Sequence, residues 1–143
     1  MCSQNVYSEV IVSHFKKPRN KGRLTRETTF ETGYNPKCGD VIHLSILMGD
    51  DDFIEDIMFD GKGCMICLAS ASILTHQVKR VPVGDVFNLI REVEKISKKD
   101  HVTEANLPPD IKALSSIQRY PTRKQCVMLA WQTLESALQK RNS

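Results

Sequence analysis

Residues 60–72 read Asp60-Gly61-Lys62-Gly63-Cys64-Met65-Ile66-Cys67-Leu68-Ala69-Ser70-Ala71-Ser72, and this stretch decides how the chain folds. It closes a strand-forming run with a corner that glycines make flexible, and then opens a helix of small residues. Four small residues in a row, 69–72, let another backbone come close. We therefore expect the helix to lie against a sheet, with Cys64 at the junction of strand and helix.

The residues before this stretch predict an antiparallel meander. In 41–48 the apolar positions Ile42, Leu44, Ile46 and Met48 alternate with Val41, His43, Ser45 and Leu47, which is typical of a strand with one buried face. Residues 49–52 form a turn, and Phe53, Ile57 and Phe59 continue on a return strand. The Thr-rich run 22–35 predicts a weaker edge strand.

Helical patterns occupy the rest of the chain. We expect helices from Ser3 to about Lys17 and from Ile66 to about Lys79, a third with Val86, Leu89, Ile90 and Val93 on one side, a fourth over Pro108 to Ile117, and a last with a stripe of Val127, Ala130, Trp131, Leu134 and Leu138. This order predicts the α+β class: a short antiparallel three-stranded sheet with helices packed on one face. At 143 residues we expect a single domain over 1–143.

Composition narrows the class of protein. Hydrophobic residues make up 41% and charged residues 26%, as in globular proteins, and no apolar run approaches the roughly 18 residues that a membrane helix needs. The start of the sequence lacks the apolar core of a secretory signal, so we expect a cytoplasmic protein. Five cysteines are then ligands, nucleophiles or core residues rather than disulfides. A net charge of +3 is too small to indicate nucleic acid as a partner.

Three cysteines with polar neighbours form the candidate site. Cys38 and Asp40 are two residues apart, so both side chains point the same way if the backbone is extended. Antiparallel pairing returns Cys64 to the start of the strand that follows Cys38. Cys126 lies in the first turns of the last helix and could reach the same end. Three thiolates and a carboxylate are a reasonable tetrahedral set for zinc.

Such a site is suited to sulfur chemistry. A carboxylate is a more exchangeable ligand than a fourth thiolate, and a thiolate freed by ligand exchange is a nucleophile that could accept sulfur from a persulfide. Arg123, one turn before Cys126, would lower thiol pKa or hold an anion, unless it is a solvated side chain. The alternative is that Cys38, Cys64 and Cys126 are buried small hydrophobes, although their polar, glycine-rich settings favour ligands.

At these residues the chain resembles a known family. The matching segments are Asn35-Pro36-Lys37-Cys38-Gly39-Asp40, Phe59-Asp60-Gly61-Lys62-Gly63-Cys64 with the helix of 69–72, Cys126 with Leu129-Ala130-Trp131, and Tyr7-Ser8-Glu9-Val10-Ile11 with Pro18-Arg19-Asn20. Together they resemble the IscU/SufU (NifU N-terminal-like) family of iron–sulfur cluster assembly. Within it the SufU-type branch is more similar, since Gln125 stands where IscU-type chains have histidine and an insertion covers about Ser97 to Ile117.

The resemblance implies a zinc-dependent sulfurtransferase of the SufU type. Such a protein accepts persulfide sulfur from a SufS-type cysteine desulfurase and supplies a downstream iron–sulfur scaffold. It further implies that Cys38 takes the sulfur and that Cys38, Asp40, Cys64 and Cys126 bind Zn²⁺. Neither nucleic acid nor a membrane is an expected partner.

The role of Cys67 remains open, and so do three other functions of the protein. Cys67 stands where the family commonly has serine, and one helical turn from Cys64 it is near enough to replace Asp40 as a ligand; it could also be a serine-sized filler. The same cysteines could assemble a transient iron–sulfur cluster. Cys64-Met65-Ile66-Cys67 could be a redox motif, although a hairpin rather than a βαβ unit precedes it. A non-catalytic zinc-binding module is the third possibility.

Overall fold

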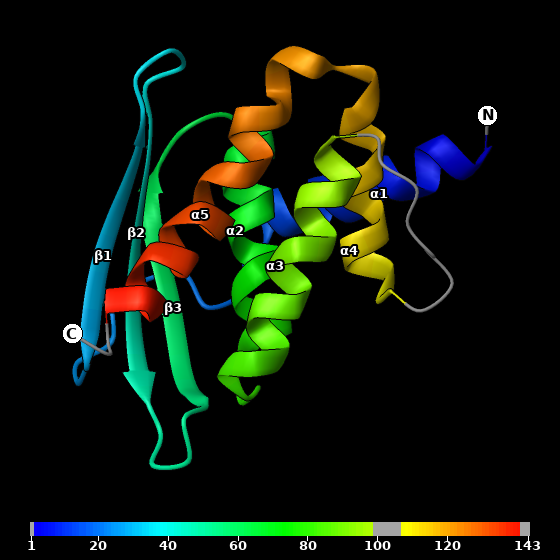
Figure 1. The fold of residues 1–143 in the computed structure, drawn as a ribbon. Coiled ribbons are helices and arrows are strands. Elements are labelled where there is room, and N and C mark those ends of the chain that lie inside the picture. Colours follow the sequence, from blue (N-terminus) through cyan, green and yellow to red (C-terminus); the bar gives the residue numbers. More distant parts are fainter. Residues whose placement is uncertain (1, 99–106, 141–143) are drawn as a thin grey trace.

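The computed structural model describes residues 2–98 and 107–140, and in this part of the chain it confirms the α+β class (Figure 1). Three antiparallel strands form a sheet in the order β1-β2-β3, with β1 at Thr29–Asn35, β2 at Asp40–Met48 and β3 at Ile54–Lys62. The helices are α1 (Cys2–Lys16), α2 (Met65–Val78), α3 (Val83–Ser97), α4 (Pro109–Ala113) and α5 (Lys124–Lys140), with 3₁₀ segments η2 (Leu114–Arg119) and η3 (Pro121–Arg123). Residues 99–106 of the expected insertion lie outside the described residues.

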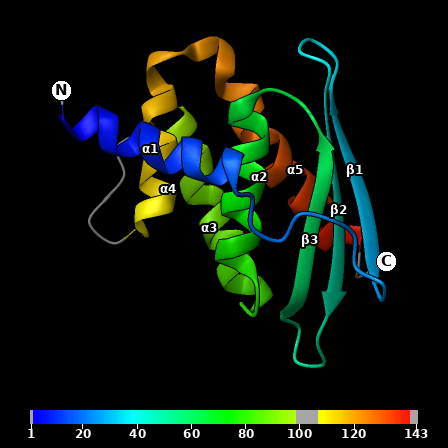
Figure 2. The ribbon, with the colours of Figure 1, turned by 180° about the vertical axis from the view of Figure 1, so that it is seen from behind.

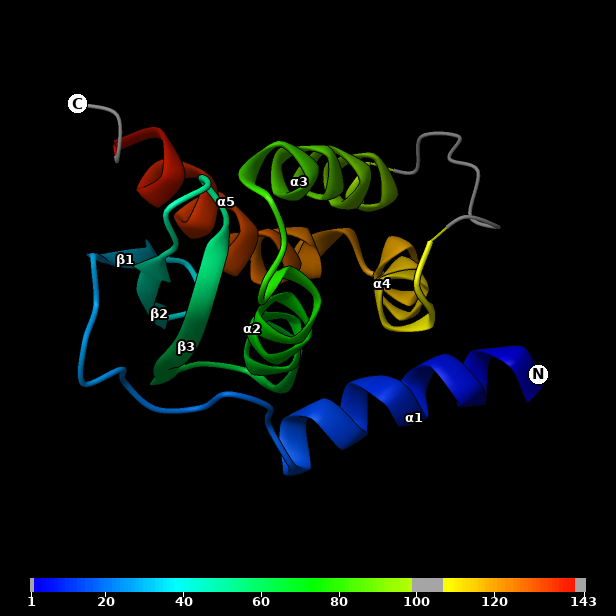
Figure 3. The same ribbon diagram turned by 90° about the horizontal axis from the view of Figure 1, so that it is seen from below.

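The helices gather on one side of the sheet, as expected. In Figures 1 and 3, α2 and α5 lie next to the strands, whereas α1, α3 and α4 lie farther out. Helix α5 packs on β1 and β2, and α2 packs on β3 and α5. The predicted stripe of α5 is buried at every position: Val127, Ala130, Trp131, Leu134 and Leu138. Among the described residues, no helix combines the length and apolar character needed to cross a bilayer.

The outer face of the sheet explains one difference from the expected strands. Ile42, Leu44 and Ile46 of β2 are fully buried against the helices, as their alternation predicts, yet Ser45 on the opposite face is buried as well. The segment after α1 covers it, and the Leu24 N–H donates to Ser45 Oγ over 3.0 Å. Residues 22–28 therefore belong to this covering segment (Figure 2), and the edge strand begins only at Thr29.

The helix expected over residues 108–117 is also different. Its α-helical part ends at Ala113, and the chain continues as 3₁₀ helix to Arg119. The hydroxyls of Ser115 and Ser116 donate to the carbonyls of Lys112 and Ala113, three residues back. Serine side chains that bond the local backbone compete with the α-helical pattern and suit this tighter turn.

The hairpin of β2 and β3 places residues 60–64 beside the start of β2. Val41 is opposite Lys62 in the antiparallel register, which confirms that the end of β3 lies beside the beginning of β2. Gly61 has a φ of +149°, and a Cβ there would collide with the Val41 carbonyl. The corner thus requires glycine, as the sequence indicated.

Candidate metal centre

Cys38 is carried on a short open turn between β1 and β2. Asn35 and Asp40 face each other across the hairpin, and the Asn35 carbonyl accepts hydrogen bonds from the N–H groups of Cys38 (3.3 Å) and Gly39 (2.9 Å). Gly39 has a φ of +72°, so the backbone between Cys38 and Asp40 is turned, and the condition of an extended backbone does not hold here. A residue in this left-handed conformation is usually glycine. Cys38 is exposed on this turn.

The turn brings Cys38 together with two buried groups from distant segments. The ligand atoms of Cys38, Asp40 and Cys126 all lie within 4.8 Å of one another. The Sγ atoms of Cys126 and Cys38 are 3.9 Å apart. Asp40 and Cys126 are both fully buried, whereas Cys38 is open to solvent. The site is therefore a buried pair of ligands with an accessible thiol above it.

Asp40 is held from two sides. Its Oδ1 accepts the Cys64 N–H over 3.1 Å, and the Asn35 side-chain amide reaches Oδ2 at 3.5 Å. A Cβ at Gly63 would lie only 2.6 Å from Asp40 Oδ1, so any side chain at position 63 would displace this carboxylate. Sequence reasoning did not single out Asn35, because Asn-Pro indicates only a turn and nothing in it points to a carboxylate five residues later.

Cys64 lies at the edge of the cluster, outside the group of three. It is partly buried at the N-terminal end of α2, and its side chain interacts with those of Cys126 and Arg123. Arg123 ends η3, just before α5, and the neighbouring Cys126 and Cys64 side chains raise the pKa of its guanidinium. The structure thus gathers Cys38, Asp40, Cys126 and Arg123, with Cys64 beside them.

The donor set fits a divalent cation. Burial, followed by the neighbouring Cys64 and Asp40 groups, raises the pKa of the Cys126 thiol well above its ordinary range. Burial and these two neighbours are the causes of the upward pKa shift at Cys126. A bound divalent ion reverses this preference, because thiolate is the form that coordinates. Sulfur and carboxylate ligands with an arginine at the rim suit zinc or an iron–sulfur cluster.

Cys67 lies beneath the site. Its side chain is fully buried on α2, and it is absent from the group of Cys38, Asp40 and Cys126. Burial, with smaller contributions from Asp40, Cys64 and Cys38, raises the pKa of Cys67 to about 12. A buried thiol with such a pKa behaves as a small core residue rather than as a reactive group.

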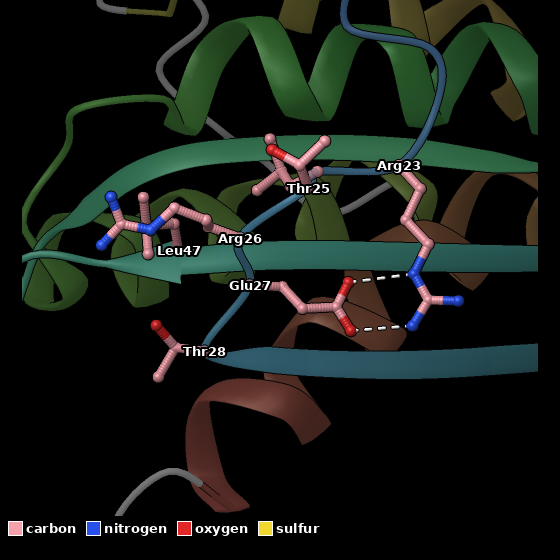
Figure 4. A pocket seen from close by; sticks show the side chains of 7 residues that line it. Arg23, Thr25, Arg26, Glu27, Thr28 and Leu47 are labelled. Atoms are coloured by element: carbon pink, nitrogen blue, oxygen red, sulfur yellow. Dashed lines mark hydrogen bonds and ion pairs between the residues drawn. The ribbon is translucent and has the colours of Figure 1, made fainter.

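A surface cavity of about 590 Å³ lies elsewhere, on the segment that precedes β1 (Figure 4). It is lined by Arg23, Leu24, Thr25, Arg26, Glu27, Thr28 and Leu47. The Arg23 guanidinium makes two hydrogen bonds to the Glu27 carboxylate, at 3.0 and 2.8 Å, and also lies over the Phe30 ring at 3.9 Å. None of the candidate ligands lines this cavity, and Arg23, one of its two arginines, is paired with Glu27.

Comparisons with known proteins agree with this geometry. The family model for the NifU-like N-terminal domain matches residues 6–142. The iron–sulfur cluster assembly scaffold protein IscU of Thermotoga maritima is 36% identical over 98% of this chain and 97% of its own length. The zinc-dependent sulfurtransferase SufU of Bacillus subtilis is 33% identical over 94% of this chain and 90% of its own length.

Solved structures show the same fold. A putative iron–sulfur cluster assembly scaffold protein for the SUF system from Fervidobacterium islandicum superimposes with a TM-score of 0.86 at 32% identity, covering 95% of this chain and 98% of that one. The N-terminal part of a NifU-like protein from Brucella abortus has a TM-score of 0.85 at 14% identity, which supports the fold alone. This chain therefore belongs to the IscU/SufU family of NifU-like N-terminal domains, which serves iron–sulfur cluster assembly.

Proposed function

We propose that this protein is a zinc-dependent sulfurtransferase that accepts persulfide sulfur from a cysteine desulfurase and passes it on for iron–sulfur cluster assembly. The observation that carries the proposal is the contrast within the site: Cys38 is exposed on an open turn, whereas Asp40 and Cys126 beside it are fully buried. Of Cys38, Asp40 and Cys126, it is Cys38 whose side chain is open to a group on a partner protein. The zinc-dependent SufU relative supports the same assignment.

The transfer needs one nucleophile and one leaving group. The Cys38 thiolate attacks the outer sulfur of the persulfide R–S–SH on the desulfurase; a bond forms between Cys38 Sγ and that sulfur, and the S–S bond of the donor breaks. The donor cysteine leaves as a thiolate with the bonding electron pair, and Cys38 becomes the persulfide. Sulfur moves between two thiols without net oxidation or reduction.

Cys38, Asp40, Cys64 and Cys126 would hold the zinc in this proposal. Bound zinc keeps thiols deprotonated at neutral pH. Asp40 is fixed in the site by the Cys64 N–H and by Asn35. Arg123, near Cys126 and Cys64, would supply positive charge for the thiolate that arrives or leaves.

The test is the alanine that a SufS-type cysteine desulfurase produces, measured with and without this protein. We expect the protein to stimulate alanine formation and Cys38→Ala to abolish the stimulation. Cys67→Ser is the matched control, because Cys67 is buried outside the ligand group, and it should retain most of the effect. Stimulation that survives Cys38→Ala would falsify the acceptor role, and loss in Cys67→Ser alone would favour a redox motif.

The second candidate is a scaffold that assembles a transient iron–sulfur cluster on the same cysteines. It is favoured by the relatives named as scaffolds, including the Thermotoga maritima protein. Anaerobic purification with metal and sulfide analysis separates the two functions. One zinc per chain without iron or sulfide supports the transferase, and iron with sulfide in equal amounts supports the scaffold.

A further inference from the structure

A buried hydrogen-bonded hub joins the two helices that carry Cys64 and Cys126. Ser70 of α2 is fully buried; its hydroxyl donates to the Val127 carbonyl over 2.7 Å and accepts the indole N–H of Trp131 over 2.9 Å. Ser70 lies six residues after Cys64, and Val127 follows Cys126 directly. Ser70 is therefore hydrogen-bonded to the first turn of α5, which also carries the candidate ligand Cys126.

The direction of the two bonds gives them different roles. The carbonyl of Val127 belongs to the backbone next to Cys126, so the bond from Ser70 fixes where the first turn of α5 lies against α2. The bond from Trp131 starts one turn farther along α5 and holds the Ser70 hydroxyl in its orientation. In a fully buried setting a serine hydroxyl has no water to replace either partner.

We propose that Ser70 is a positioning residue for the metal centre: through Val127 it sets the distance between Cys126 on α5 and Cys64 at the start of α2. This inference rests on the proposed function, since it concerns the affinity of that site for zinc. Removing a residue that orients a ligand commonly costs 10- to 100-fold in metal affinity. Ser70 acts one step away from the ligand, so we expect the lower end of that range.

Ser72 provides a matched control on the same helix. It is also a fully buried serine of α2, and its hydroxyl also has two hydrogen-bond partners. These are the His14 ring of α1 and the N–H of Arg19, which follows α1. Ser72→Ala and Ser70→Ala both delete one buried hydroxyl and both should lower stability. Only Ser70→Ala loosens the helix that carries Cys126.

The experiment measures zinc affinity by competition with a chelator, and in parallel the urea unfolding of each variant. We expect Ser70→Ala to bind zinc about tenfold more weakly and Ser72→Ala to stay within about twofold of the parent chain. Adding Trp131→Phe to Ser70→Ala removes the stranded indole donor, so a loss of zinc affinity that persists in the double variant is not caused by that unsatisfied group.

Each result has one meaning. Equal zinc affinity in the parent chain and Ser70→Ala, or equal losses in Ser70→Ala and Ser72→Ala, would overturn the positioning role while leaving the proposed function intact. Failure of the parent chain itself to bind zinc would overturn both. Tenfold weaker binding confined to the Ser70 variants supports the inference.

Discussion

Two polar clusters border α2, and they differ in whether their polar groups are paired with one another by hydrogen bonds. The ligand cluster comprises Cys38, Asp40, Cys64 and Cys126; the histidine cluster comprises His14, Arg19, Ser72 and Asp110. In the histidine cluster, His14 is 1% exposed, with Nδ1 2.8 Å from Ser72 Oγ and Nε2 2.8 Å from Asp110 Oδ2. The Arg19 N–H also donates to Ser72 Oγ over 2.8 Å.

Counting donors and acceptors shows that the histidine cluster is complete in itself. Ser72 Oγ accepts the Arg19 N–H and directs its own proton at His14 Nδ1, so a neutral His14 carries its proton on Nε2 and donates to Asp110. The ligand cluster instead brings two thiols and a carboxylate within 4.8 Å of one another, with Arg123 near its rim. The two clusters therefore differ in kind: the histidine cluster stabilises the fold, whereas the ligand cluster has the donor set of a candidate cation site.

The largest expected effect comes from breaking the ligand cluster. Cys126→Ala deletes a buried sulfur ligand, so we expect zinc affinity to fall by about 100-fold or more, equivalent to roughly 2.7 kcal/mol. His14→Phe, which breaks the histidine cluster, should leave zinc affinity nearly unchanged. Chelator competition on both variants measures this, and a similar loss in the two would erase the distinction between the clusters.

Breaking the histidine cluster should reduce stability instead. His14→Phe keeps a ring of similar size but leaves Ser72 and Asp110 without their partner, for an expected loss of about 2 kcal/mol in the free energy of unfolding. Urea unfolding of the zinc-loaded protein measures it. A stability equal to that of the parent chain would mean that the three hydrogen-bonded segments are held together by apolar packing alone.

The pH dependence of stability sharpens the same comparison with a smaller effect. Burial, opposed by the hydrogen bond to Asp110, lowers the pKa of His14, and Arg19 and His76 act in the same direction as burial. The unfolded chain then binds more protons than the folded one as the pH falls through about 6.5, where an unperturbed histidine titrates. Stability should be full above that pH and decline below it until the lower folded pKa is passed.

The His14→Phe variant is the control for this titration. Urea unfolding at pH 7.5 and 5.5, on protein treated with chelator so that thiol protonation does not contribute through zinc, should show a smaller pH-dependent loss in the variant than in the parent chain. Identical losses would assign the pH dependence to groups other than His14.

Arg123 should give the smallest effect. Its side chain is exposed, and charge interactions at the surface are weak, so we expect Arg123→Ala to lower the rate of sulfur acceptance about two- to fivefold without changing zinc content. Arg123→Lys should retain most of the rate because it keeps the charge. Desulfurase assays with metal analysis measure both, and loss of zinc in Arg123→Ala would instead make Arg123 part of the metal-holding structure.

The sequence was informative where pattern and pairing determine position. The alternation of 41–48 and the glycine corner at Gly61 sufficed to bring Cys64 beside the start of β2, and the apolar stripe of α5 oriented Cys126 toward the sheet. The hydrogen bonds that shape the turn at Gly39 were not predictable, because nothing in the sequence marks the Asn35 carbonyl as the acceptor for the N–H groups of Cys38 and Gly39.

Hydrogen-bond partners that lie far apart in the sequence could not be predicted from sequence patterns either. His14 fits a helical stripe by spacing, but Asp110, its partner 96 residues away, follows only from the packing of α4 on α1. Ser70 and Ser72 look equivalent in a run of small residues. In the structure, however, Ser70 hydrogen-bonds to α5 and Ser72 hydrogen-bonds to His14 of α1. Such differences arise from which helix packs on each side of α2, and local periodicity does not contain that information.

The ligand set itself is best tested by X-ray absorption at the zinc edge on protein purified with its metal. We expect three sulfur neighbours at about 2.3 Å and one oxygen neighbour at about 2.0 Å, from Cys38, Cys64, Cys126 and Asp40. Four sulfur neighbours would make Cys67 the fourth ligand in place of Asp40. Two or fewer sulfur neighbours would contradict the convergence of the three cysteines on one ion.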